Sequence, residues 1–111
     1  MTAAKRALVR GTLDMLILKT LSWAPLHGYG IANQIEFASG NVFKVNPGSL
    51  LTALRRLERA GLLDSQWQKT ANSRKAKYYS LTPAGQKHLA AERKDWERRA
   101  GAVARLLSAE G

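Results

Sequence analysis

The sequence has 111 residues, a formal net charge of +10 and no cysteine. Disulfides and thiolate metal sites are therefore excluded, and the length fits one compact domain with at most one appended element. No apolar run reaches about 18 residues, and the start has no apolar segment followed by a small-residue cleavage site, so we expect a cytoplasmic protein without a membrane span. A basic excess of this size is typical of chains that bind polyanions.

The first helix is predicted from Thr12 to about Trp23. Its buried face recurs at helical spacing, in Leu13, Leu16, Ile17 and Leu21. Thr12 is suited to cap this helix, and the charge of Asp14 favours the positive end of a helix. Pro25 disfavours helical structure in the residue before it and so ends the element. Residues 1–10 are expected to form a loose or helical arm.

A turn that contains His27 opens a second predicted helix, which ends at Gly40. Its buried face is marked by Ile31, Ile35 and Ala38. The two histidines, His27 and His88, lie far apart and have no cysteine or paired carboxylates beside them, so neither a metal site nor a cofactor is predicted. We expect His27 to be a turn residue. A short β-favouring run, residues 42–45, leads into the next helix.

The stretch from Asn46 to Gly61 predicts the helix around which the chain is organised. Asn46 is a good N-cap, Pro47 fits the first helical position, and Gly61 lies where a helix commonly ends. At about 100° per residue, one face is aliphatic and the opposite face carries a threonine and three arginines. Such a helix fits the DNA major groove, where arginines reach phosphates and guanine edges. The alternative is an ordinary basic surface. The candidate DNA contacts on this helix are Ser49, Thr52, Arg55, Arg56 and Arg59.

After Gly61 the apolar period changes from that of a helix to that of a strand, which predicts a β-hairpin with strands at about 63–68 and 75–81. The basic residues at its tip and on its returning strand are Lys69, Arg74, Lys75 and Lys77. A hairpin beside a basic helix is the arrangement of a winged helix-turn-helix, whose wing lies along the phosphate backbone or enters the minor groove. For Lys75 and Lys77 the alternative is a charged strand edge that deters aggregation.

Thr82 and Pro83 begin a last helix that extends to about Leu107, close to 40 Å at ~1.5 Å per residue. Its apolar stripe consists of Leu89, Trp96, Ala100, Val103 and Leu107. This stripe needs a partner surface, and a second copy of the same helix in a twofold dimer is the economical one. The alternative is a helix folded back onto its own domain. The predicted fold is thus mainly α with a small β-hairpin: a winged helix-turn-helix domain, residues 1–81, and a C-terminal dimerisation helix, residues 82–111.

Six stretches occur in a characteristic order: Gly-Thr-Leu-Asp-Met-Leu-Ile-Leu (11–18), Leu-His-Gly-Tyr-Gly-Ile-Ala (26–32), Pro-Gly-Ser-Leu (47–50), Ala-Leu-Arg-Arg-Leu-Glu (53–58), Gly-Leu-Leu (61–63) and Arg-Lys-Ala-Lys-Tyr-Tyr-Ser-Leu-Thr-Pro-Ala-Gly (74–85). In this order they resemble the PadR family of transcriptional regulators, in its short form with a single C-terminal helix. That family usually has Tyr-Pro after Gly-Ser-Leu, where this chain has Leu51 and Thr52. The DNA contact of the family's tyrosine is therefore not transferred to this chain.

The resemblance implies a homodimer that represses a promoter by binding a near-palindromic double-stranded operator. Its two recognition helices would enter successive major grooves about 34 Å apart. The resemblance also implies a small aromatic effector that binds between the C-terminal helices and releases the DNA. Trp96 matches a tryptophan that some relatives stack on planar ligands, and the alternative for Trp96 is an anchor of the dimer core. A repressor without a ligand stays open.

No enzyme is predicted, because the sequence has no glycine-rich phosphate loop, no nucleophile with a nearby base and no carboxylate cluster. The rival function is binding of RNA or single-stranded DNA without sequence preference, which favours exposed aromatics among the basic residues. Trp67, Tyr78 and Tyr79 fit that pattern, but strand alternation places Tyr78 and Tyr79 on opposite faces, so at least one packs inward. A protein–protein adaptor of the same fold would not need the arginine face.

Overall fold

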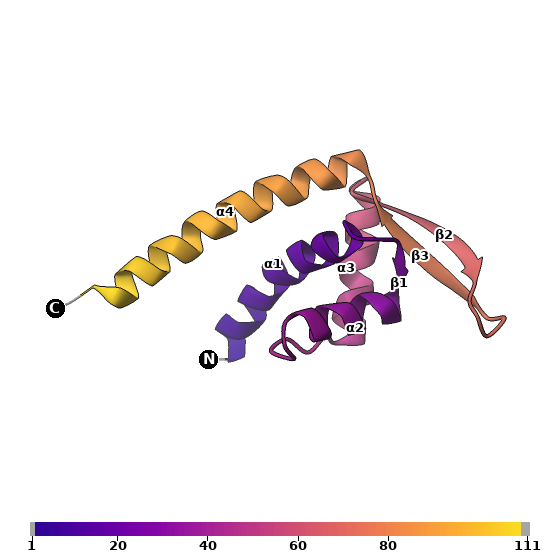
Figure 1. Ribbon diagram of the computed structural model, residues 1–111, viewed down its shortest axis with the longest axis horizontal. Coiled ribbons are helices and arrows are strands. Elements are labelled where there is room, and N and C mark those ends of the chain that lie inside the picture. The colour runs from indigo at the N-terminus through magenta and orange to yellow at the C-terminus, as the bar shows by residue number, and fades with distance from the viewer. Residues whose placement is uncertain (1, 110–111) are drawn as a thin grey trace.

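The structure is a computed structural model that describes the backbone of residues 2–109 and the side chains of residues 12–109. Its elements in chain order are α1 (Thr2–Leu21), β1 (Leu26–His27), α2 (Gly28–Ala38), α3 (Pro47–Arg59), β2 (Leu63–Lys69), β3 (Lys75–Leu81) and α4 (Pro83–Ser108). Helices α1, α2 and α3 pack together, the β2–β3 hairpin projects on one side, and α4 leaves on the other (Figure 1). The predicted fold class is confirmed. None of the described helices combines the length and the apolar composition that a membrane crossing requires.

The hydrophobic core lies where the three packed helices meet the base of the hairpin. Its largest fully buried side chains are Ile17, Leu18, Ile31, Leu54 and Leu63. Burial of each such side chain contributes about 1.5–3 kcal/mol, so this cluster supplies most of the domain's stability. The buried positions predicted for α1 and α2 are largely confirmed. Ala38 is the exception, because it is exposed at the last turn of α2.

Helix α1 begins at Thr2, and the prediction that Thr12 caps it is wrong. The helix continues through Gly11, whose cost in a helix interior is only about 1 kcal/mol, and several alanines in the first turns favour helix. From residue 2 onward the backbone of the predicted arm is therefore helical, while the side chains of the arm lie outside the described residues. Asp14 consequently lies within the helix rather than at the positive end of the helix. The carboxylate of Asp14 therefore does not stabilise that end. The helix ends at Leu21, close to the predicted end.

The hairpin follows the prediction closely. Its two strands pair in antiparallel register from Leu63 opposite Leu81 to Lys69 opposite Lys75. A third strand, β1, was expected to be a turn; it pairs with β3 through Leu26, opposite Tyr79, and the sheet order is β1-β3-β2. Residues 42–45 have no strand structure, although they favour it by composition.

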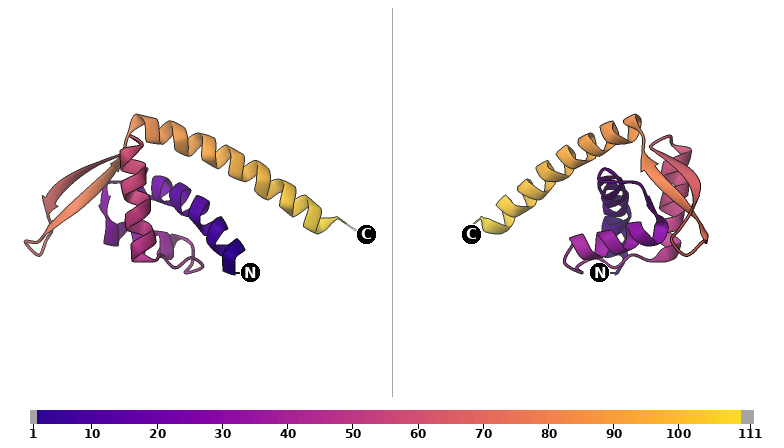
Figure 2. Two further views of the ribbon diagram at one scale, coloured as in Figure 1. Left: turned by 180° about the vertical axis from the view of Figure 1, so that it is seen from behind. Right: turned by 45° about the vertical axis from the view of Figure 1, so that its right-hand side comes forward.

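Helix α4 is fixed at its start by Thr82. The Thr82 hydroxyl accepts a hydrogen bond from Gly85 N at 2.9 Å and donates one to Gly61 O at 2.8 Å, and Thr82 N donates to Leu62 O at 3.2 Å. The predicted start of the helix is thereby confirmed. Leu89 still packs against the core, but the rest of the helix extends away and gives the molecule a length of 61 Å (Figures 1 and 2). The start of α4 thus contacts α1 and the core, whereas its later turns leave the domain.

We predict that Gly85→Ala destabilises the domain by about 1–3 kcal/mol, the usual range for overpacking. A Cβ at Gly85 would clash with Leu62 O, which belongs to the backbone and cannot move aside cheaply. Urea denaturation followed by circular dichroism measures the change. Gly101→Ala is the control on the same helix, because a Cβ there meets only the Arg105 side chain at 3.7 Å. Equal stability of the two variants would contradict the close approach at Gly85.

Candidate nucleic-acid interface

Helix α3 has the boundaries that its sequence predicts. The Asn46 side chain accepts a hydrogen bond from Ser49 N at 3.0 Å, and Pro47 occupies the first turn. The helix ends at Arg59, and Gly61 follows with a φ of 78°, in the left-handed region that favours glycine. Its buried face consists of Leu50, Ala53, Leu54 and Leu57. The helix therefore turns its opposite face to solvent.

One flank of α3 is tied to α1 by an ion pair. Arg56 Nη1 lies 2.7 Å from Asp14 Oδ2 and Arg56 Nη2 lies 2.9 Å from Asp14 Oδ1, a bidentate arrangement. The hydrogen bonds that Arg56 donates to Asp14 raise the pKa of the Arg56 guanidinium above its ordinary value. Arg56 was predicted as a DNA contact, but its guanidinium is directed at the protein's own first helix. Since Asp14 lies 42 positions earlier in the chain, helical spacing could not identify the pair.

The other flank of α3 is tied to the hairpin by Glu58. Ser65 of β2 donates a hydrogen bond to Glu58 Oε2, and Lys77 Nζ of β3 lies 3.4 Å from Glu58 Oε1. The hydrogen bond from Ser65, and then the Lys77 ammonium, hold the pKa of Glu58 below its ordinary value despite partial burial. Lys77 also lies 5.7 Å from the ring centroid of Tyr79. One carboxylate on α3 thus contacts both strands of the wing, and Lys77 has a partner within the protein.

Between these two flanks, the crest of α3 is open to solvent. Thr52, Arg55 and Arg59 lie at i, i+3 and i+7 and are all exposed, and Ser49 is exposed beside them. Within the part of the chain whose side chains are described, neither Arg55 nor Arg59 forms an ion pair. Two guanidinium groups on one ridge are therefore available to an external anion. Leu51, at the position where the family that the sequence resembles has tyrosine, is also exposed, and it lines a groove together with Lys75 and Lys77 of the wing.

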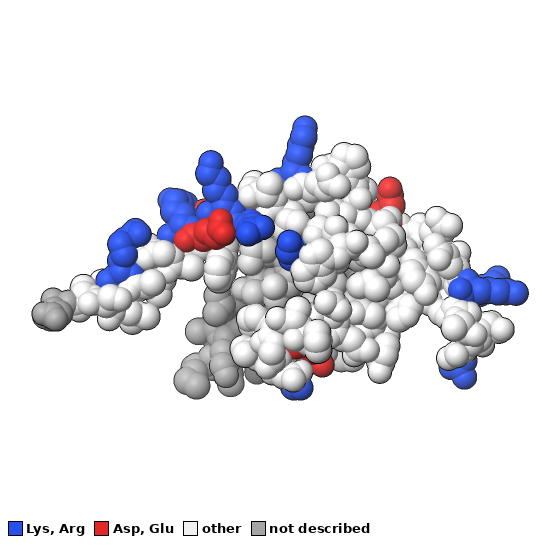
Figure 3. Space-filling view, in the orientation of Figure 1, with Lys and Arg blue, Asp and Glu red and all other residues white. Residues whose placement is uncertain are grey.

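The far end of the wing forms a second basic surface. Lys69, Arg74 and Lys75 are exposed there, and Figure 3 shows basic side chains gathered at this tip. The tip turn is closed by a hydrogen bond from Thr70 N to Arg74 O at 2.7 Å. The predicted positions of these three residues in the hairpin are confirmed, and their contact with nucleic acid stays a prediction.

Sequence reasoning missed two residues beside this surface. His27 caps α2, because its Nδ1 accepts a hydrogen bond from Gly30 N at 3.0 Å. Tyr29, in the first turn of α2, is 75% exposed and lines a groove that also contains Leu51 and Lys75. The first helix of a helix-turn-helix crosses the DNA backbone, so a phenol here is well placed for a phosphate. In the sequence, the pattern that could have indicated Tyr29 as a surface contact is an aromatic residue between two glycines.

The apolar stripe of α4 is uncovered in the single chain. Trp96 is 48% exposed and Leu107 is 80% exposed, Val103 is also exposed, and Ala100 is half-buried. Only Leu89 of the predicted stripe packs against the hydrophobic core. Among the described residues, no group of three or more His, Asp or Glu side chains is arranged to hold a metal ion.

Comparison with known proteins agrees with this geometry. The model of the transcriptional regulator PadR-like family matches residues 17–91. The transcriptional regulator Rv3488 of Mycobacterium tuberculosis is 32% identical over 92 residues, which cover 83% of this chain and 82% of that protein.

Solved structures extend the similarity to nearly the whole chain. The crystal structure of a PadR family transcriptional regulator from Eggerthella lenta superposes with a TM-score of 0.81 at 30% identity, covering 98% of this chain and 93% of that one. A PadR-like transcriptional regulator from Bacillus cereus also gives a TM-score of 0.81, at 24% identity and over 94% of this chain and 99% of that one. At this lower identity, the similarity to the Bacillus cereus protein supports the fold alone.

We predict that the contacts of Glu58 with Ser65 and Lys77 lose their contribution to folding stability as the pH falls through the lowered pKa of Glu58. A carboxylate whose pKa is lower in the folded state stabilises the fold above its unfolded pKa and loses that contribution in acid. The measurement is the unfolding free energy of wild type minus that of Glu58→Gln, taken from about pH 6 to about pH 3. We expect a positive difference that shrinks toward acid. A difference independent of pH would show that the charge of Glu58 contributes nothing.

Proposed function

The chain belongs to the PadR-like family of transcriptional regulators, and we propose that it represses a promoter by binding a near-palindromic duplex operator as a cytoplasmic homodimer. The observation that carries this proposal is that the charged residues of α3 form two groups, one paired within the protein and one exposed. Arg56 and Glu58 hold the two flanks of the helix, while the crest with Arg55 and Arg59 is exposed and unpaired among the described side chains. A charged ridge held in one orientation is suited to a DNA groove.

In this proposal the crest reads bases and the wing binds phosphates. Arg55 and Arg59 reach guanine edges or phosphates in the major groove, and Ser49 and Thr52 add hydroxyl contacts. On the wing, the exposed residues Lys69, Arg74 and Lys75 follow the sugar–phosphate backbone. We assign Arg56 and Lys77 to holding α3 in place, because each has a carboxylate partner within the protein.

Dimerisation is proposed through the stripe of α4. Its exposed side chains span from Trp96 to Leu107, and an uncovered apolar face of this length is stabilised by burial against a like face. A twofold dimer presents two copies of α3, so its operator has matching twofold symmetry.

An aromatic effector would bind at the same stripe. The half-exposed indole of Trp96 offers a flat surface in the middle of the dimer seam, and a planar ligand stacked on it would change how the two α4 helices cross. A change in that crossing alters the separation of the two recognition helices, and DNA is released. The alternative role of Trp96 is an anchor of the dimer core.

The rival function is binding of RNA or single-stranded DNA without sequence preference. One observation favours it: Trp67 is 65% exposed on the wing near basic residues. Against it, Tyr79 is buried in the core and so cannot stack on a base. Footprinting on the DNA upstream of the gene, with salt varied and with single-stranded competitors, separates the two functions. A protected duplex site that survives the competitors supports the proposal, and equal binding of all nucleic acids overturns it.

We predict that Arg55→Ala or Arg59→Ala weakens operator binding by about 1–3 kcal/mol, the range for an arginine that contacts a base. Fluorescence anisotropy with operator and scrambled duplexes measures the effect. Arg56→Ala is the comparison on the same helix: because it removes the pair with Asp14, any loss of binding should be accompanied by lower thermal stability, whereas the loss in Arg55→Ala should not. If Arg56→Ala alone weakened binding by the folded protein, the assignment of the crest would be wrong.

We predict that Trp96→Ala and Leu107→Ala shift the protein toward monomer in sedimentation equilibrium. Truncation of a central aromatic anchor commonly costs about 2 kcal/mol or more of association free energy. Leu106→Ala is the matched control for Leu107, because it removes an equally exposed leucine that lies off the stripe. A dimer unaffected by the stripe variants would contradict the proposed seam.

A further inference from the structure

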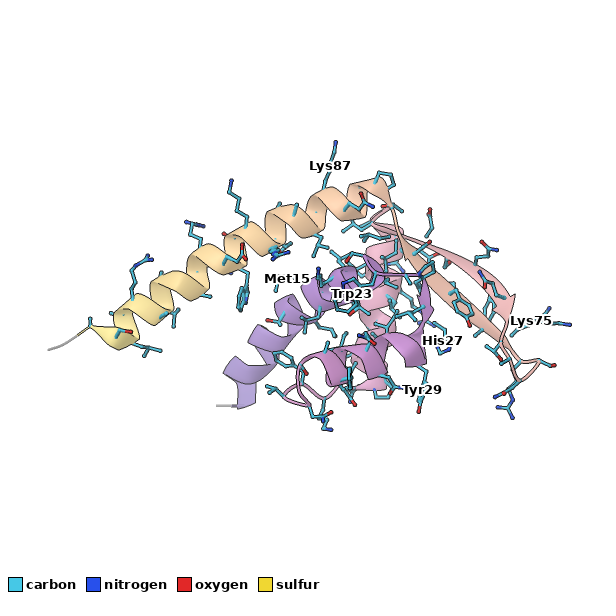
Figure 4. The ribbon with its side chains drawn as sticks, in the orientation of Figure 1. Met15, Trp23, His27, Tyr29, Lys75 and Lys87 are labelled. Atoms are coloured by element: carbon cyan, nitrogen blue, oxygen red, sulfur yellow. The ribbon has the colours of Figure 1, made fainter. Side chains whose placement is uncertain are left out.

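The outer side of α4 carries four exposed basic side chains in one line, called here the basic row: Lys87, Lys94, Arg98 and Arg105. At about 100° per residue, their spacing places all four within roughly 40° of one another around the helix. At ~1.5 Å per residue the row is about 27 Å long. In Figure 4 Lys87 points away from α1 and α2, and Figure 3 shows basic side chains along the outer edge of α4.

The acidic residues of α4 are paired in a way that leaves most of this row free. The described contacts are those of Glu92 with His88, of Glu97 with Arg93, and of Asp95 with Arg98 and Arg99. Within the part of the chain whose side chains are described, Lys87, Lys94 and Arg105 form no ion pair. Three cations on one face are therefore available to an external anion.

The basic row lies apart from the other surfaces that have been given a role. Lys87 and Trp96 are separated by half a turn around the helix axis, so dimerisation through the apolar stripe leaves the row on the outside. The start of α4 is bonded to Gly61, which follows the end of α3. The row therefore lies beyond the C-terminal end of α3 rather than beside its crest, and one straight duplex seated on the crest is not aligned with it.

The composition of this face indicates which kind of partner fits it. Between the cations the same face presents only small residues, among them Ala91, Gly101 and Ala102. A protein interface has an apolar core, an amphipathic membrane helix inserts large apolar side chains, and single-stranded nucleic acid stacks on aromatic rings. The row offers none of these. Duplex phosphates need only cations and a close approach, and about 27 Å corresponds to roughly eight base pairs of duplex.

We propose that the basic row binds the phosphate backbone of a second duplex DNA segment, without reading its sequence. The crest of α3 and the wing hold the operator in the same complex, and this part rests on the proposed function. A twofold dimer carries two basic rows on its outside. One dimer bound to its operator therefore holds a further DNA segment beside it.

Capture of a second duplex tests the proposal. Operator duplex is fixed on beads and loaded with the full chain at one dimer per duplex, and unbound protein is washed away. A labelled duplex of scrambled sequence and about 20 base pairs, long enough to cover the row, is then added. We expect the loaded beads to retain it, with an affinity that falls as the salt concentration rises. Absence of retention would overturn the proposal.

Charge variants locate the contact. Lys87→Gln combined with Lys94→Gln should weaken retention by about two- to tenfold, the effect of two exposed charge contacts, and leave operator affinity unchanged. Arg93→Gln combined with Arg99→Gln is the matched control and should leave retention unchanged, because it removes the same charge from the same helix outside the row. Equal losses in the two variants, or lower operator affinity in the row variant, would contradict the assignment.

Crosslinking tests the contact without an operator. Because the chain has no cysteine, Ala91→Cys places a single photoreactive group within the row, and Ala104→Cys places one about 140° away around the helix. We expect the scrambled duplex to crosslink to position 91 and not to position 104. Equal crosslinking, or none, would refute the row as a DNA surface. Should the protein bind no operator at all, the proposed function fails, while this measurement still decides whether the row contacts a duplex.

Discussion

The bidentate pair between Arg56 and Asp14 fixes the rotation of α3 about its own axis, and the use of its exposed face depends on that rotation. Stability comes from elsewhere. Each buried leucine of α3 contributes about 1.5–3 kcal/mol, whereas an ion pair whose side chains are 41% and 24% exposed contributes about 1 kcal/mol or less. A leucine stripe alone tolerates some rolling of the helix, because hydrophobic burial has no direction. Two parallel hydrogen bonds do have direction, so the pair specifies which residues face outward.

Glu58 supplies the matching constraint on the opposite flank. Since residues of a helix advance by about 100° each, Arg56 and Glu58 point to opposite sides of the crest that carries Arg55 and Arg59. Their partners lie on α1 and on both strands of the wing, so three elements are held in one arrangement. The orientation of the recognition helix and that of the wing are thereby coupled. The groove between α2, α3 and β3 depends on the same coupling, because its two walls are α3 and the wing.

Local signals predicted much of this structure. The cap at Asn46, the prolines at 47 and 83 and the alternation after Gly61 each act over a few residues, and the elements they predict are found nearly where expected. The misses have non-local causes. Thr12 is a good capping residue and predicts the start of α1, but the helix continues past it. Strand β1 has two residues, which are too few to show the alternation of apolar and polar side chains that predicts a strand. The DNA contact of Arg56 stays a prediction; what the sequence did not indicate is its ion pair with Asp14, because Asp14 lies on another helix.

The central claim is that two copies of the α3 crest occupy successive major grooves of one duplex. Because the chain has no cysteine, Thr52→Cys gives a single attachment point on the crest for an iron chelate that cleaves nearby DNA. We expect two clusters of cleavage placed symmetrically about the operator centre and separated by about one helical turn, roughly 34 Å. A chelate attached through Lys94→Cys on α4 should give no such clusters. Diffuse cleavage from position 52, or stronger cleavage from position 94, would contradict the account.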